Sequence, residues 1–462
     1  MPPSSAPRDA DVALHLHAEL LPNIRQVTLY VTLPRLPALE GVQPQIQLSE
    51  SCKSVTVSLP EPWNHVSETL KLPARVASAT RQNTNLRMST PSTPAQPADS
   101  GLEYSLRMMI HPSDVATATP DVVSDEYVPW TAADMTPLTR MRCRGCGTPF
   151  MKDGGSEESV NGELPSVRSE WLWKDLPSGN WAEMMDFWHC HKPDPHEHDP
   201  KSEADAALKL EGETAQMKGF GAASRVEAIP GTVLIDVASF LLSEADCTNL
   251  NRYIGTTRHT DLVIAWQACI EGSETGNATS PLERSLQCTK CEGIVGMDDP
   301  SARGWRLLKA HLSLSHDPTS PSVDEATWDS PPVQLIVAAQ LLELIERESA
   351  RRFVVHRGQK QGLLLWVFNP DLRYSNSGSD YNVSAQQAMK VLYQTIQDVD
   401  VLLTPEIGNP SPLSVEELEL PAMVYGALEQ ALRESSEILP STARQFNEWK
   451  VGLLHRFSRI QV

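Results

Sequence analysis

The chain has 462 residues, of which 40% are hydrophobic and 21% are charged, so it is long enough for two or three globular domains. Its 39 basic and 59 acidic side chains give a formal net charge of −20, which argues against direct nucleic-acid binding because phosphate affinity needs a clustered basic face. No stretch resembles a signal peptide, and no apolar run approaches the about 20 residues of a membrane span. We therefore expect no membrane association and a cytoplasmic and nuclear location.

The first region, residues 1–140, is rich in predicted β-strands. Residues 54–60 and 102–110 alternate apolar and polar side chains, which is typical of strands with one buried face. Residues 27–33, "VTLYVTL", are a further strand candidate. We predict an antiparallel sandwich or barrel for this N-terminal β-rich domain.

The middle region, residues 141–325, contains two Cys-x-x-Cys pairs, in "RCRGCG" and "LQCTKC". Eight cysteines in a reducing compartment favour metal ligands over disulfides. Two residues between cysteines let both sulfurs reach one tetrahedral ion, and a glycine such as Gly147 can take the positive φ that such turns need. Arg144 and Lys290 each lie between a pair of thiols and would offset their charge. Redox pairs or packed thiols are the alternative interpretation. We favour one structural Zn²⁺ bound by four ligands, Cys143, Cys146, Cys288 and Cys291.

The stretch "NWAEMMDFWHCHKPDPHEHDP", residues 180–200, concentrates histidine, cysteine, tryptophan and carboxylate side chains. Asn180 and Glu183 resemble a capping box and predict a helix that begins at Trp181 and ends before the prolines. Cys190 and His191 then lie at its C-terminal end.

Cys190 leaves two further hypotheses open. In one, Cys190 completes the site of the first cysteine pair together with His191 or His189, and the second pair finds other ligands. In the other, Cys190 is a nucleophile whose pKa is lowered by nearby histidines. Adjacent residues on a helix do not face each other, so we interpret this stretch as a structural or docking element.

The last region, residues 326–462, is predicted to be α+β. Residues 329–352, 384–399 and 421–438 have helical patterns, and residues 353–356 and 362–370 are predicted to pair as a hairpin. The polar stretch 369–381 begins with Asn-Pro, which predicts an exposed loop. In that loop we select two candidate partner-binding residues, Asp371 and Arg373, with a salt bridge within the turn as the alternative. The predicted fold class of the whole chain is α+β, with the zinc-knuckle β region in the middle.

Six motifs point to a known family. In chain order they are "RCRGCG", "LPSGNWAEMMDFWHCHKPD", "LQCTKCEGIVG", "GLLLWVFNPDLRYS", "AMKVLYQ" and "LPSTARQFNEWKVGLL". Residues 140–462 resemble the HECT-like, ubiquitin-conjugating-enzyme E2-binding proteins, and the polar insertions are similar to those of a fungal member. The resemblance implies an E3 ubiquitin-ligase-like protein that binds an E2. It also implies a link to mRNA 3′-end processing through the endonuclease subunit of the cleavage and polyadenylation machinery.

The resemblance assigns the stretch 180–200 to the family's signature helix. The matching positions are Trp181, Glu183, Asp186, Trp188, Cys190 and His191. The candidate partner-binding residues are Trp181, Glu183, Asp186 and Trp188, although the helical spacing of the two tryptophans favours a core role for them.

The sequence departs from true HECT ligases in one respect. Those enzymes need a thioester-forming cysteine in a C-terminal lobe, and this chain has no cysteine after Cys291. Either Cys190 or another earlier thiol accepts ubiquitin, or the protein only positions an E2. The expected function is therefore an E2-binding, E3-like zinc protein. The alternative is a non-catalytic zinc scaffold or assembly factor for the 3′-end-processing endonuclease.

Overall fold

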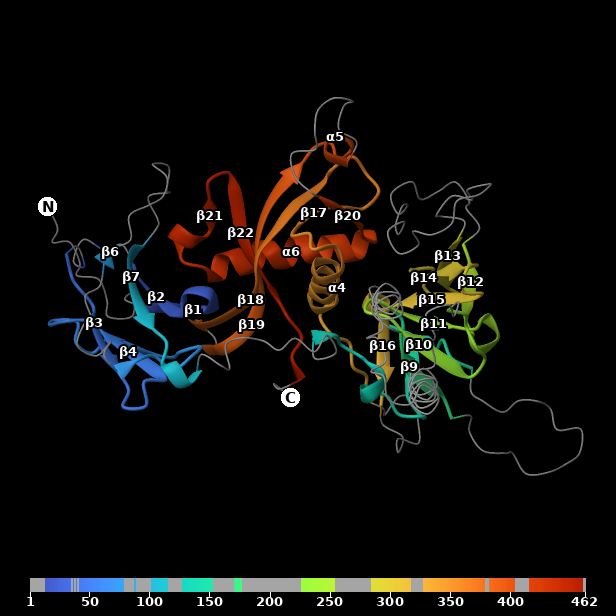
Figure 1. Ribbon diagram of the computed structural model, residues 1–462, viewed down its shortest axis with the longest axis horizontal. Helices are drawn as coiled ribbons and strands as arrows, with labels where there is room; N and C mark the ends of the chain where they lie inside the picture. Colours follow the sequence, from blue (N-terminus) through green and yellow to red (C-terminus); the bar gives the residue numbers. More distant parts are fainter. Residues whose placement is uncertain are drawn as a thin grey trace, which may run out of the picture.

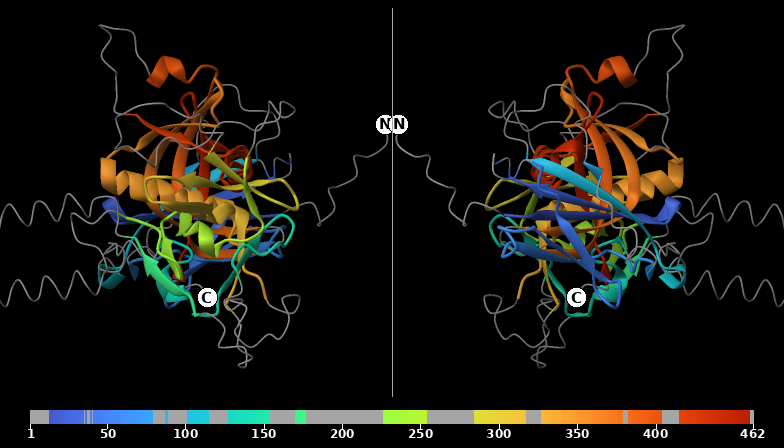
Figure 2. Two further views of the ribbon diagram at one scale, coloured as in Figure 1. Left: turned by 90° about the vertical axis from the view of Figure 1, so that its right-hand side faces the viewer. Right: turned by 90° about the vertical axis from the view of Figure 1, so that its left-hand side faces the viewer.

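The computed structural model describes residues 13–34, 36, 39, 41–78, 87–88, 101–114, 127–152, 170–176, 226–253, 284–316, 327–378, 382–403 and 415–459. Three bodies lie along the long axis of this part of the chain (Figure 1). The N-terminal strands lie at one end, and a helix-covered sheet lies in the centre. The unit formed by strands β8 to β16, which contains Cys143, Cys146, Cys288 and Cys291 and is called the cysteine-containing unit below, lies at the other end. The two end-on views of Figure 2 place the cysteine-containing unit and the N-terminal strands at opposite ends.

One sheet of ten strands combines elements from both ends of the sequence. Its main path runs β21-β22-β19-β18-β1-β2-β7-β6, while β17 branches from β18 and pairs with β20. All pairs are antiparallel except the parallel pair of β17 and β20. The strands are β1 (His15–Leu21), β2 (Gln26–Leu33), β6 (Arg87–Met88), β7 (Leu102–Met109), β17 (Arg352–His356), β18 (Gly362–Ser377), β19 (Asn382–Ile396), β20 (Glu416–Glu419), β21 (Gln445–Phe446) and β22 (Trp449–His455).

The long hairpin of β18 and β19 holds this sheet together. The first part of β18 pairs with β17, for example Trp366 opposite Arg352, whereas its last part pairs with β1, for example Arg373 opposite Leu20. Register shifts occur between Val367 and Leu372, and such bulges bend a strand and change which face a side chain occupies. The two halves of the sheet are therefore joined through one continuous strand.

The N-terminal half of the sheet is covered by a second, three-stranded antiparallel sheet. Val27, Leu29 and Val31 of β2 share one core with Val55 and Val57 of the second sheet. This confirms the predicted antiparallel packing of the N-terminal region. The covering strands are β3 (Gln45–Leu48), β4 (Ser54–Ser58) and β5 (Ser67–Lys71).

Two long helices cover one face of the C-terminal half of the sheet. Helix α4 (Val333–Glu348) and helix α6 (Ala422–Ile438) share an apolar core with β17, β18 and β19. A third helix, α5 (Asp400–Leu403), is short. Gly452 of β22 allows α6 to approach, because a Cβ at this position would lie 2.7 Å from the Leu432 carbonyl oxygen. None of the described helices is long and apolar enough to span a lipid bilayer.

The cysteine-containing unit consists of a seven-stranded sheet and a separate two-stranded pair. The larger sheet has the order β12-β13-β14-β15-β11-β10-β9, and β8 pairs with β16. Both contribute side chains to one apolar core. The strands are β8 (Arg140–Cys143), β9 (Leu172–Asp175), β10 (Thr232–Ile235), β11 (Ser239–Leu242), β12 (Leu250–Arg252), β13 (Ser285–Cys288), β14 (Ile294–Asp299), β15 (Gly304–Leu308) and β16 (Leu312–Ser315).

The predicted α+β class is wrong, because the described chain is mostly β-strand with three α-helices. The helices predicted near 329–352 and 421–438 are confirmed as α4 and α6, but residues 384–399 lie mainly in β19. Both faces of β19 are buried: Met389 and Val391 pack toward the helices, while Ala388 and Leu392 belong to a core on the opposite face. A strand buried on both faces has no polar face, so its period-two signal is lost.

The predicted loop at 369–381 is also wrong, since β18 continues to Ser377. Pro370 lies where the register shifts, and bulges are positions where a strand tolerates proline. Asp371 forms an ion pair with Arg456, beyond β22, rather than with Arg373. The proposed division at residues 140 and 325 stays a prediction, although strands of the first and last regions share one sheet.

A buried ion pair links β1 to β19. Both carboxylate oxygens of Glu19 accept hydrogen bonds of 2.8 Å from Lys390 Nζ, and the His17 ring nitrogen Nε2 lies 3.3 Å from the same carboxylate. The Glu19 side chain is 3% exposed. Burial alone would raise the pKa of Glu19, but the Lys390 ammonium and His17 lower it from 4.5 to about 2. The carboxylate is therefore ionised throughout the neutral range.

We predict that Glu19→Gln lowers the free energy of unfolding at pH 7 by about 3–5 kcal/mol, because it leaves a buried ammonium without its partner. The pKa of Glu19 is lower in the folded state, so its stabilisation is complete above pH 4.5 and disappears as the pH falls toward about 2. Urea unfolding at several pH values measures both effects. The control is Glu448→Gln, at an exposed position, and a difference between wild type and Glu19→Gln that does not shrink in acid contradicts the assignment.

Candidate metal centre

The first cysteine pair lies on a tight turn at the end of β8. The Cys143 N–H donates to the Thr148 carbonyl at 2.8 Å, and the Gly147 N–H donates to the Cys143 carbonyl at 2.9 Å. Gly147 has φ of +74°, a conformation that glycine adopts without strain. The positive φ predicted for Gly147 is confirmed. This turn places the sulfurs of Cys143 and Cys146 on the same side.

The second cysteine pair repeats this geometry at the end of β13. The Cys288 N–H donates to the Gly293 carbonyl at 2.9 Å, and the Glu292 N–H donates to the Cys288 carbonyl at 2.9 Å. Glu292 has φ of +56° and occupies the position that Gly147 has in the first turn. The left-handed residue of this turn is thus Glu292, one position before Gly293.

The two turns face each other and bring four sulfur atoms together. The sulfurs of Cys143 and Cys291 are 3.7 Å apart, and those of Cys146 and Cys288 are 3.5 Å apart. All four lie within 4.8 Å of one another. A disulfide needs about 2.05 Å, whereas four sulfurs about 2.3 Å from a tetrahedral zinc lie about 3.8 Å from each other. The donor set and its spacing therefore fit one tetrahedral metal ion.

Burial and hydrogen bonds shift the pKa values of the cluster thiols in different directions. Burial raises the pKa of Cys143 to about 12, and burial also raises the pKa of Cys291. At Cys146 the effect of burial is outweighed by hydrogen bonds from the Thr148 hydroxyl and N–H and from two thiols, which lower its pKa to about 6. Since metal ligands must be thiolates, an ion that binds here displaces the remaining protons.

Arg144 connects the first turn to the central body. It was expected to offset the charge of the thiolates, and its guanidinium donates to the carbonyls of Pro331 at 3.0 Å and Ala310 at 3.4 Å. Its backbone N–H donates to the His311 carbonyl at 2.9 Å. Pro331 lies just before α4, so the turn is attached directly to the start of that helix.

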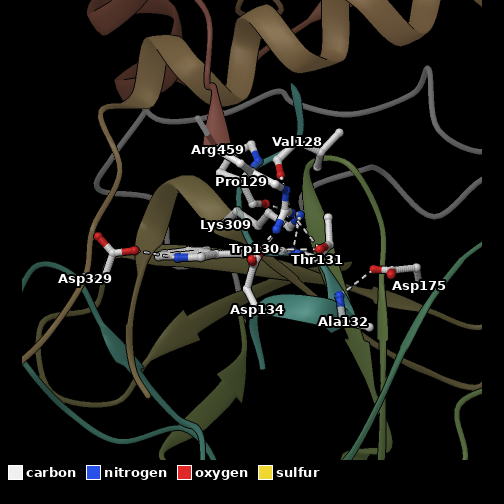
Figure 3. Close-up of polar contacts among 10 residues, drawn as sticks. All are labelled: Val128, Pro129, Trp130, Thr131, Ala132, Asp134, Asp175, Lys309, Asp329 and Arg459. Carbon is white, nitrogen blue, oxygen red and sulfur yellow. Dashed lines mark hydrogen bonds and ion pairs between the residues drawn. The ribbon is translucent and has the colours of Figure 1, made fainter. Parts of the chain in front are cut away.

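A buried lysine, Lys309, contacts the segment of Pro129 and Trp130 (Figure 3). Lys309 is fully buried, and its Nζ donates to the carbonyls of Pro129 at 2.9 Å and Trp130 at 3.1 Å. Burial lowers the pKa of Lys309 to about 7, while the carboxylates of Asp236, Asp175 and Asp134 oppose this change. No sequence pattern indicates this role, because Lys309 is a single lysine within an apolar stretch.

Arg459 extends the same network to the C-terminal part of the chain, as Figure 3 shows. Its guanidinium forms an ion pair with Asp134 and donates to Thr131 Oγ1 at 2.7 Å. The adjacent Trp130 indole N–H donates to Asp329 at 2.8 Å. Residues 127–134 thus contact the cysteine-containing unit, the approach to α4 and the segment after β22.

Several predicted site residues lie outside the described part of the chain. These are Trp181, Glu183, Asp186, Trp188, Cys190 and His191. Their assignment to a signature helix stays a prediction. Asp371 and Arg373 both lie on β18, in a different sheet from the strands that carry the cysteine turns. Their partner-binding role also stays a prediction.

Together, the fold and the cysteine cluster describe a β-rich protein with a candidate structural metal centre. The family described as "HECT-like Ubiquitin-conjugating enzyme (E2)-binding" matches residues 19–451, and the chain belongs to this family. The resemblance recognised from the motifs is therefore confirmed. No solved structure matches the chain.

Curated relatives are similar to the chain at low identity. An uncharacterised Saccharomyces cerevisiae protein is 25% identical over 60% of this chain and 62% of its own length. An uncharacterised Schizosaccharomyces pombe protein is 25% identical over 75% of this chain and 82% of its own length. A human protein named as an E3 ubiquitin-protein ligase is 23% identical over 68% of this chain and 71% of its own length.

We predict that the purified chain carries about one equivalent of a tightly held divalent metal ion, and that replacing Cys143 and Cys146 with serine releases it. The variant should also have a markedly lower melting temperature, because a structural metal contributes its binding free energy to folding. Cys247→Ser is the matched control: Cys247 is buried in the same unit but outside the cluster, so the metal should remain. Full metal content in the double variant contradicts the ligand set. Elemental analysis and thermal denaturation provide the two measurements.

Proposed function

We propose that this chain is an E3-type protein that binds a ubiquitin-conjugating enzyme and positions it for transfer, without carrying ubiquitin itself. Membership of the E2-binding family over residues 19–451 is the observation that supports E2 binding. The relatives named as E3 ubiquitin-protein ligases support the ligase-like role. The absence of cysteine after Cys291 supports the positioning mode, because a ubiquitin thioester needs a cysteine thiol.

The cysteines of the described residues support the same mode. Four thiols belong to the cluster, where a metal ion makes them unavailable as acceptors. Cys52 and Cys247 are 3% and 6% exposed, and burial raises the pKa of Cys247 to about 12, so little reactive thiolate forms. Cys190 and Cys269 lie outside the described residues and are the two remaining candidates for covalent transfer.

We propose that the metal ion is Zn²⁺ and that its role is structural. Four thiolates in a tetrahedral arrangement are typical of structural zinc, whereas a catalytic zinc keeps one position open for water or substrate. Cys143 and Cys288 are almost fully buried in the core of their unit. With four cysteine ligands, no coordination position remains open for water or substrate. The ion would therefore join the two turns and perform no chemistry of its own.

We propose more narrowly that the chain acts with the mRNA cleavage and polyadenylation machinery, in the nucleus as well as the cytoplasm. Its support is the net charge of −20, which suits contact with a basic, RNA-binding protein such as an endonuclease subunit. A pull-down from native extract at low and high salt tests this proposal. Recovery of an E2 without any processing subunit at either salt concentration removes this narrower proposal and leaves E2 binding intact.

We predict that the chain accelerates discharge of ubiquitin from a loaded E2 in a single-turnover assay without forming a thioester adduct. Cys190→Ser and Cys269→Ser should discharge at the wild-type rate, because positioning needs neither thiol. Non-reducing and reducing gels of the reaction distinguish an adduct from simple discharge, and E2 alone is the control. A reducing-agent-sensitive adduct that disappears in Cys190→Ser, with the melting temperature unchanged, would show that the chain carries ubiquitin.

A further inference from the structure

A pocket of about 230 Å³ lies where the N-terminal and C-terminal strands of the large sheet meet. Tyr30 comes from β2, Phe368 from β18, Lys390 from β19 and Phe446 from β21. The pocket therefore exists only when both ends of the sequence have folded together. It lies in a different body from the cysteine cluster, so the candidate metal centre does not account for it.

Four polar side chains line this pocket, and two of them, Lys390 and Tyr30, have donors that are not used within the described chain; the Thr442 hydroxyl and the Gln445 amide N–H already donate to Glu103 and to the Asn447 carbonyl. Lys390 donates to both carboxylate oxygens of Glu19, and its third ammonium proton forms no hydrogen bond within the described part of the chain. The Tyr30 hydroxyl likewise has no hydrogen-bond partner among the described residues. Burial raises the pKa of Tyr30 to about 12, and the carboxylate of Glu19 adds to this, so the phenol stays protonated. An occupant with a carbonyl or carboxylate oxygen complements these two donors.

Apart from Thr442 and Gln445, the rest of the pocket lining is apolar, and the pocket is partly open. Leu392 and Val451 line it, and Phe368 and Phe446 stand at it with 53% of each side chain exposed. Phe368 is held against Trp366 at a ring distance of 5.8 Å and an interplanar angle of 79°. Exposed aromatic side chains beside a small pocket are typical of the energetically dominant part of a protein interface.

The size and the charge of the molecule restrict the occupant. A volume of about 230 Å³ is below the roughly 300–1,000 Å³ of most small-molecule sites, and this favours one anchor side chain of a protein partner. A second copy of this chain would carry the same net charge of −20, and like charge opposes self-association. The partner class that the family description provides is a ubiquitin-conjugating enzyme, and every residue that lines the pocket falls within the matched range 19–451.

We propose that this pocket is the docking site for the ubiquitin-conjugating enzyme. An apolar side chain of the enzyme enters between Phe368 and Phe446, and an adjacent carbonyl oxygen accepts hydrogen bonds from Lys390 and Tyr30. This inference rests on the proposed E2-binding function and adds its location.

The test is the affinity of the full-length chain for a panel of purified ubiquitin-conjugating enzymes, measured by calorimetry. Phe446→Asp should weaken binding of the enzyme that the wild type selects by at least about 30-fold, because it removes an anchor and places a carboxylate beside the apolar pocket. Tyr30→Phe should weaken it by about three- to tenfold through loss of one hydrogen bond. Val401→Asp, at a 67% exposed apolar residue of α5 away from the pocket, is the matched control and should bind as the wild type does.

The possible outcomes distinguish a failure of the proposed docking site from a failure of the proposed E2-binding function. Wild-type binding that persists at full affinity in Phe446→Asp overturns the docking site and leaves E2 binding intact. A wild type that binds no enzyme of the panel overturns the proposed function and this inference together. Sedimentation of each variant reports self-association: if Phe446→Asp dissociates a wild-type dimer but retains E2 affinity, the occupant is a second copy and the proposal is wrong. Melting temperatures confirm that the variants are folded.

Discussion

The cysteine cluster is the constraint on which the arrangement of the cysteine-containing unit depends. It joins two turns that are separated by 142 residues and that belong to different sheets. Only β8 and β16 form the smaller sheet, and a two-stranded pair has little stability of its own. Closing a loop of this length costs conformational entropy that grows only slowly with its length. On the proposal that these four thiolates bind one ion, the ion would supply the compensating free energy at one point, and the long connection between the turns would add little further cost.

Polar contacts connect the cysteine-containing unit to the approach to helix α4 in the centre of the molecule. Arg144 holds the carbonyl of Pro331 at the approach to α4, and β16 contacts the same approach through a bridge between Leu314 and Asp329. Lys309 and Arg459 add hydrogen bonds to residues 127–134. A buried ammonium is costly unless its protons have acceptors, so the carbonyls of Pro129 and Trp130 define one orientation of this segment. These directional bonds specify how the two bodies meet in a way that apolar contact alone does not.

The sequence predicted local patterns well and non-local consequences poorly. The two cysteine turns were identified because their chemistry is encoded in four adjacent positions, and α4 and α6 were identified because each has one polar face. Strand β19 was mistaken for a helix because distant segments bury both of its faces, so a local window shows no alternation of apolar and polar side chains. Lys309 was missed for the same reason, since its acceptors lie about 180 residues away. The ten-stranded sheet was not predicted, because nothing local shows that β1 pairs with β18.

Several titratable side chains buried in the large sheet are paired with another titratable side chain. Glu19 is held by Lys390, the Tyr374 hydroxyl contacts the His455 ring at 2.7 Å, and His356 contacts Glu417 at 2.7 Å. Glu19 is a weak base at neutral pH, because its pKa is lowered to about 2, and burial also lowers the pKa of His455. The C-terminal half also lacks a thiol after Cys291. The large sheet also carries donors of Lys390 and Tyr30 that are not used within the described chain, beside exposed aromatic rings, and these are the groups of the proposed docking site. A ligase-like function in this fold is therefore better explained by holding an activated enzyme in place than by accepting its cargo.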